Sequence, residues 1–158
     1  MIGGLHHNAY RCRDSEETRA FYEDFLGLKL AHALRIGESR TGRSVQALHT
    51  FFELGDGSFL AFFEVPEMPF EFKRQHDFDL HIALASDDAT MDSMVAKARA
   101  AGQDVRGPVD HGFIRSIYLR DPNGYVVELT APIPGAEEPS RDAAHDVLAA
   151  WQGDKPRV

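Results

Sequence analysis

The chain has 158 residues, of which 43% are hydrophobic and 27% charged, and its 17 basic and 25 acidic residues give a formal net charge of −8. This suits one globular domain, or two small halves that share a core, and argues against nucleic acid or an anionic membrane as a partner. The single cysteine excludes an internal disulfide and any Cys-rich zinc or iron–sulfur site, whereas eight histidines suffice for a site of His and carboxylate ligands. Because no signal-peptide pattern and no apolar run of ~20 residues is present, we expect a cytoplasmic protein.

The first half of the chain predicts a strand, a helix and three more strands. A partly alternating strand over residues 5–12 precedes a helix that Asp14 can cap, with Glu17 three residues later and Gly27 at the end. The three strands are predicted at about 28–34, 47–54 and 58–65. A polar exposed loop, a hairpin turn and a linker are predicted at 35–46, Asp56-Gly57 and about 66–78.

The second half repeats this order. A strand over about 79–84 precedes a helix over about 89–101, which Asp88 can cap and Gly102 ends. Further strands are predicted at about 103–106, 113–120 and 125–131, the last two joined by the turn Asp121-Pro122-Asn123-Gly124. We therefore expect an α+β fold of paired βαβββ modules that form a curled mixed sheet. The predicted domain spans 1–131, with module one at about 5–65 and module two at about 79–131.

Residues 132–158 differ from both modules and are predicted to form a tail with a short helix. Ser140 can cap this helix. Its apolar face consists of Ala144, Val147, Leu148 and Trp151. A lone amphipathic helix of this length is marginal in water, so we expect it to pack on the domain or on a second subunit.

Three candidate metal ligands occupy comparable positions in the two modules, namely His7, His81 and Glu128. His7 and His81 each lie seven residues before a predicted capping aspartate, which favours His7 over its neighbour His6. Glu128 shares a strand face with Thr130, and a carboxylate among apolar residues is costly to bury unless it is paired or binds metal. The position equivalent to Glu128 in module one is Ala61. Two histidines and one carboxylate leave about three positions of an octahedral metal open, as in non-haem Fe(II) oxygenases.

A structural explanation is also open for each of these residues. His6 and His7 can lie at the start of a strand, His81 can be a hydrogen-bonded core histidine, and Glu128 can pair with an arginine. The coincidence of all three at repeat positions favours the metal site.

Three stretches resemble the vicinal oxygen chelate superfamily, which includes glyoxalase I, bleomycin-resistance proteins, fosfomycin-resistance enzymes and type I extradiol dioxygenases. They read HHNAYRCRDSEETRAFYEDFLGLKL, LHIAL and IRSIYLRDPNGYVVELT and cover most of residues 5–131. The resemblance implies modules that curl around a divalent metal on His7, His81 and Glu128. Glyoxalase I enzymes usually have a fourth ligand where Ala61 stands, which argues against the isomerase. Fosfomycin-resistance and extradiol enzymes resemble this chain in using two His and one Glu.

Tyr118 resembles the tyrosine of extradiol dioxygenases whose hydroxyl can bond a substrate oxygen, and Leu60-Ala61-Phe62 also looks extradiol-like. Fosfomycin-resistance enzymes can also have a tyrosine at this position, and Tyr118 can equally be an aromatic strand residue that fills the cavity wall. Extradiol enzymes usually place a catalytic histidine just before Leu60-Ala61-Phe62, where Ser58-Phe59 stand here. A base would then come from elsewhere, and His49 and His111 are the candidates, although for each histidine alone a surface or loop position is the favoured interpretation.

The leading hypothesis is a type I extradiol ring-cleaving dioxygenase that acts on a catecholic substrate with O2. Fe(II), or else Mn(II) or Zn(II), would bind His7, His81 and Glu128, with Tyr118 and either His49 or His111 as catalytic residues. The resemblance and the apolar tail helix also predict a homodimer. The alternatives are a fosfomycin-resistance-like transferase or hydrolase, a glyoxalase-like lyase, and a non-enzymatic ligand-binding module.

Overall fold

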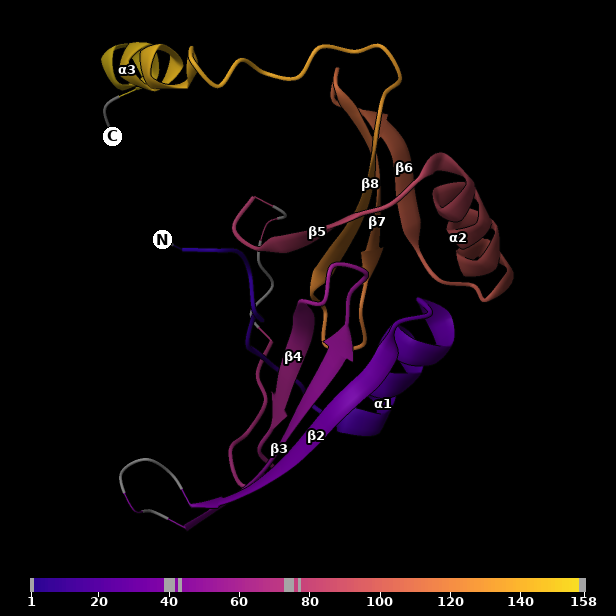
Figure 1. Ribbon diagram of the computed structural model, residues 1–158. Coiled ribbons are helices and arrows are strands. Elements are labelled where there is room, and N and C mark those ends of the chain that lie inside the picture. The colour runs from indigo at the N-terminus through magenta and orange to yellow at the C-terminus, as the bar shows by residue number, and fades with distance from the viewer. Residues whose placement is uncertain (1, 39–41, 43, 73–75, 77, 157–158) are drawn as a thin grey trace. The chain divides into compact units, whose positions relative to one another are not determined.

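The computed structural model describes residues 2–38, 42, 44–72, 76 and 78–156. Its strands form two four-stranded sheets in the orders β1-β4-β3-β2 and β5-β8-β7-β6 (Figure 1). The predicted α+β class is confirmed, because each sheet is accompanied by a helix and a further helix follows the last strand. The chain divides into two compact units, one made of Met1–Ile82 with Leu119–Val127 and the other of Ala83–Tyr118 with Glu128–Val158.

The first sheet contains one parallel and two antiparallel strand pairs. Its strands are β1 (Tyr10–Arg11), β2 (Lys29–Glu38), β3 (Ser44–Glu53) and β4 (Phe59–Glu64). The predicted strand over 5–12 is mostly irregular, since only β1 and one isolated bridge, between His7 and Phe59, pair with β4. The predicted loop over 35–46 is wrong at both ends, because residues 35–38 belong to β2 and residues 44–46 to β3. Polar side chains suit these strand ends because none of them is buried.

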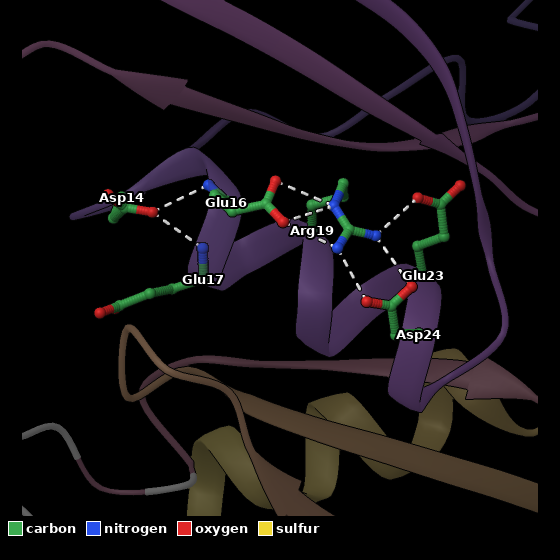
Figure 2. A network of polar contacts seen from close by, with 6 residues as sticks. All are labelled: Asp14, Glu16, Glu17, Arg19, Glu23 and Asp24. Carbon is green, nitrogen blue, oxygen red and sulfur yellow. Dashed lines mark hydrogen bonds and ion pairs between the residues drawn. The ribbon is translucent and has the colours of Figure 1, made fainter.

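The first helix begins where the sequence predicts. The carboxylate of Asp14 accepts hydrogen bonds from the backbone N–H groups of Glu16 and Glu17, both at 2.8 Å (Figure 2). The helix α1 (Ser15–Arg19) continues as a π-helical segment, η1 (Ala20–Phe25). Figure 2 shows the guanidinium of Arg19 held by the carboxylates of Glu16, Glu23 and Asp24, a network that spans the junction of the two segments.

The first sheet uses its two faces differently, because side chains alternate along β3 and β4. On one face, Phe52 and Phe62 pack against Tyr22 of η1, with ring centroids 5.5 and 4.8 Å from that of Tyr22. The opposite face carries the aromatic and imidazole rings of His49 and Phe51 from β3 and Phe59 and Phe63 from β4. We call this second surface the histidine face.

The second sheet contains β5 (His81–Ala85), β6 (Val105–Asp110), β7 (Ile114–Arg120) and β8 (Val126–Pro132). The helix α2 (Asp88–Ala100) is capped by Asp87, which accepts from the N–H of Thr90, and not by Asp88 as predicted. Asp88 instead forms an ion pair with Arg115. The cap therefore follows His81 by six residues rather than seven, which removes the spacing argument for His7 over His6.

The last helix, α3 (Ala144–Asp154), has no buried residue. Its apolar side chains Val147, Leu148 and Trp151 remain 67%, 55% and 59% exposed. Ser140 is not the N-cap predicted from the sequence, because its hydroxyl accepts from the N–H of Ala143, which precedes the helix. None of the described helices combines the length and the apolar character that crossing a membrane requires.

Candidate functional site

His7 lies beside the first sheet, where its neighbour His6 helps to fix it. The carbonyl of His6 accepts a hydrogen bond of 3.0 Å from the N–H of Phe59, and His7 forms an isolated parallel β-bridge with the same residue. The Nδ1 atoms of His6 and His7 are 2.8 Å apart, so one of them donates to the other. The imidazole of His7 lies against the histidine face. Its ring centroid is 5.4 Å from that of Phe51 and 6.0 Å from that of His49.

His49 is the buried member of this group. Its side chain is only 8% exposed, and its ring stacks on Phe63 with centroids 3.6 Å apart. Its Nε2 is fully enclosed and has no hydrogen-bond partner within the described part of the chain. Burial lowers the pKa of His49, and the nearby His7 lowers it further. The imidazole is therefore neutral at pH 7, with a nitrogen lone pair that no protein donor occupies when Nε2 is unprotonated.

Tyr118, Glu128 and His111 are brought together in the other unit. The hydroxyl of Tyr118 donates to Oε1 of Glu128 at 3.2 Å and lies 2.8 Å from Nε2 of His111. Glu128 is 5% exposed, whereas His111 is exposed to solvent. The neighbouring pair on the same two strands, Ser116 and Thr130, is also hydrogen bonded, so Glu128 and Thr130 do share a face.

The charged groups around Tyr118 have opposite effects on the pKa of its phenol. Burial raises the pKa of its phenol, and the carboxylate of Glu128 raises it further. The guanidinium of Arg106 lies 4.3 Å above the ring centroid and has the opposite effect on this pKa. The phenol is therefore a hydrogen-bond donor at pH 7. The sequence carried no signal for Arg106, because its contact depends on the pairing of strands β6 and β7.

The remaining predicted ligand, His81, is the first residue of β5 and is exposed. Among residues that the structure describes, no three His, Cys, Asp or Glu side chains form a preformed metal cluster. The predicted residues thus fall into two groups, His7 with His49 and Tyr118 with His111 and Glu128.

The donor chemistry of these residues fits a divalent transition metal. Imidazole nitrogens and a carboxylate suit Fe(II), Mn(II) and Zn(II). A carboxylate as buried as that of Glu128 needs a compensating partner, and the hydroxyl of Tyr118 supplies one hydrogen bond to it.

Comparisons with known proteins agree with this fold. The model of the Glyoxalase/Bleomycin resistance protein/Dioxygenase superfamily matches residues 4–129. A probable lactoylglutathione lyase of Vibrio parahaemolyticus is 32% identical over 136 residues, which cover 80% of this chain and 89% of that protein.

Solved structures show the same fold. A glyoxylase/bleomycin resistance protein/dioxygenase domain from Frankia sp. has a TM-score of 0.67 at 16% identity, covering 85% of this chain and 96% of its own. The fosfomycin resistance protein FosX of Listeria monocytogenes, solved with Mn(II) and sulfate, has a TM-score of 0.62 at 21% identity, covering 86% and 98%. With its family model matched over most of its length, the chain belongs to the Glyoxalase/Bleomycin resistance protein/Dioxygenase superfamily.

Proposed function

We propose that this chain is a divalent-metal enzyme that moves a proton on a small substrate carrying two adjacent oxygen atoms, and that His7, His81 and Glu128 hold the metal. The donor set supports this proposal, as does the Mn(II) in the related FosX structure. When bound, the metal would act as a Lewis acid toward the substrate oxygens.

The hydrogen-bonded series His111–Tyr118–Glu128 is the observation that carries the proposal. A hydroxyl 3.2 Å from a buried carboxylate and 2.8 Å from an exposed imidazole can hold a proton at Oη and exchange it through His111 with solvent. Tyr118 then donates to, or accepts from, a substrate oxygen, and Glu128 orients its hydroxyl.

A glyoxalase-like lyase is the reaction that this arrangement supports best. Such a reaction consists of proton transfers on the substrate, which Tyr118, with His111 and Glu128, would perform. The 32% identity to a probable lactoylglutathione lyase supports the same choice.

An extradiol ring-cleaving dioxygenase is the second candidate, which the position of Tyr118 ten residues before Glu128 favours. The site just before Leu60 holds no base, because the hydroxyl of the buried Ser58 donates to Asp56 at 2.6 Å. His111 would therefore serve as the base in this reaction.

A parallel assay separates the two reactions. The protein is purified anaerobically and loaded with Fe(II), Mn(II) or Zn(II). Lactoylglutathione formation and O2 uptake with a panel of catechols are then measured on each form. Lactoylglutathione formation without O2 uptake is the expected result. O2 uptake with a ring-cleaved product on the Fe(II) form would support the dioxygenase, and the absence of any bound metal would contradict both.

A further inference from the structure

The buried nitrogen of His49 has no explanation in the packing of the first sheet. Leaving a buried polar atom without a hydrogen bond costs about 1–3 kcal/mol. The Nε2 of His49 is such an atom among the described residues, although its ring is well packed between Phe51 and Phe63. A phenylalanine at position 49 would pack against Phe51 and Phe63 equally well. The position therefore points to a ligand that the nitrogen binds.

His7 is the neighbouring residue that indicates the nature of this ligand. The rings of His7 and His49 have centroids 6.0 Å apart. A metal–imidazole nitrogen distance of ~2.1 Å places the centroids of two rings on opposite sides of one ion about 6.5 Å apart, and those of two rings on adjacent octahedral positions about 4.6 Å apart. At 6.0 Å the two imidazoles can share one metal ion on roughly opposite sides of it.

His6 prepares His7 for such a role. Its Nδ1 lies 2.8 Å from the Nδ1 of His7, which leaves the Nε2 of His7 for coordination. Metal-binding histidines usually have their second nitrogen fixed by a hydrogen bond in this way.

The strand register places a small side chain beside His49 on the same face. In the strand register His49 pairs with Phe63 and Phe51 pairs with Ala61, so Ala61 is a diagonal neighbour of His49. The methyl group of Ala61 is the smallest side chain on the histidine face.

We propose that His49 is a further ligand of the divalent metal, which it binds through Nε2 beside His7. This inference rests on the proposed metal-dependent function. Together with His7, His81 and Glu128 it would make four protein ligands, which leave about two positions of an octahedral ion open. Those two positions would suit two adjacent substrate oxygens and would leave none for O2. A fourth ligand at His49 therefore favours the lyase over the dioxygenase.

Cobalt binding tests this assignment without any substrate. Co(II) alone is titrated into the full-length protein, and its affinity and visible absorption spectrum are measured. The substitution His49→Phe keeps an aromatic ring in the packed position and removes only the ligand. We expect the absorption bands to shift and the Co(II) affinity to fall by at least about 10- to 100-fold, the loss typical when only a hydrogen-bond partner of a metal ligand is removed.

Two further variants, His32→Phe and His7→Ala, show whether a loss of Co(II) affinity is specific to His49. His32→Phe is the matched control, since His32 also lies against Phe51 and Phe59, with centroids 6.1 and 5.6 Å away. This control is expected to bind Co(II) as the wild type does. Wild-type affinity and an unchanged spectrum in His49→Phe, with loss of binding in His7→Ala, would overturn the role of His49 alone. Absence of Co(II) binding by the wild type would overturn the metal-dependent function as well. Circular dichroism of each variant verifies that it is folded.

Discussion

Tyr118 connects a buried carboxylate to an exposed imidazole, and this makes it the residue whose loss is most informative. Its hydroxyl is the only atom of the side chain that touches Glu128 and His111 in the hydrogen bonds described above. Removing the hydroxyl leaves the ring beneath Arg106 in place. The substitution therefore separates proton transfer from packing.

We expect Tyr118→Phe to lower kcat by about 10²-fold, the lower end of the contribution of a general acid or base. Its Co(II) affinity is expected to fall by no more than about 10- to 100-fold, because Tyr118 hydrogen-bonds the proposed ligand Glu128 and is not itself a proposed ligand. Steady-state kinetics and Co(II) titration check the two expectations. Tyr125→Phe, at a tyrosine that stacks on Tyr10, is the control and keeps the wild-type kcat. An unchanged kcat in Tyr118→Phe would contradict the relay.

Cys12 gives a prediction about pH and stability. It is 1% exposed, and burial raises the pKa of its thiol above the ordinary value of 9.0. The folded protein therefore holds this proton more tightly than the unfolded chain. The stability that this contributes is complete below pH 9 and is lost as the pH rises through the folded-state pKa.

Urea unfolding between pH 8 and pH 10 measures this effect. The free energy of unfolding of the wild type is expected to fall with pH more steeply than that of Cys12→Ala. Equal slopes would mean that the thiol titrates alike in both states. Because the reactive species is the thiolate, the folded protein should also react slowly with a disulfide reagent at pH 8.

At the scale of elements, the turns and caps with a local chemical cause were predictable. Asp14 caps α1, and the Asp121 carboxylate accepts from the N–H groups of Asn123 and Tyr125 in the predicted turn. The choice between the adjacent Asp87 and Asp88 was not predictable, because the ion pair of Asp88 with Arg115 joins distant parts of the sequence. The candidate site shows the same difference between features with a local cause and features that depend on distant residues. The face of Glu128 followed from strand alternation, whereas the pairing of His7 with His49 depends on long-range register.

Two glycines in turns distinguish backbone strain from steric clash. Gly57 and Gly124 have φ angles of +83° and +93°, which other residues rarely adopt. A Cβ on Gly57 would meet nothing within 4 Å, whereas one on Gly124 would lie 2.8 Å from Cδ1 of Phe72. Each alanine variant is therefore expected to lose about 1–2 kcal/mol through strain.

Gly124→Ala is expected to lose more than Gly57→Ala because it adds the clash with Phe72. Urea unfolding of the two variants measures the difference. The double variant Gly124→Ala with Phe72→Ala relieves the clash, so the coupling between the two changes should be favourable. Equal losses for the two glycines would show that the ring of Phe72 moves aside without cost.

At the scale of the whole molecule, the internal repeat appears in the strand order. Each sheet places its first strand beside its last, as β1-β4 and β5-β8. Ala61 and Glu128 are each the third residue of these last strands. The repeat therefore supplies two similar frameworks on which the chemical groups differ, with imidazoles and aromatic rings on the first and a carboxylate with a phenol on the second. The domain boundary at 131 and the homodimer stay predictions.

The C-terminal helix α3 contributes little to stability in this structure, because none of its residues is buried. Hydrophobic stabilisation requires removal of apolar surface from water, and Val147, Leu148 and Trp151 keep more than half of theirs exposed. Deletion of residues 139–158 is therefore expected to leave the urea midpoint and the Co(II) affinity unchanged. A lower midpoint would show that the helix packs on the rest of the chain in solution. Sedimentation velocity of both proteins checks the predicted homodimer, and a change from dimer to monomer on deletion would assign this apolar face to the subunit contact.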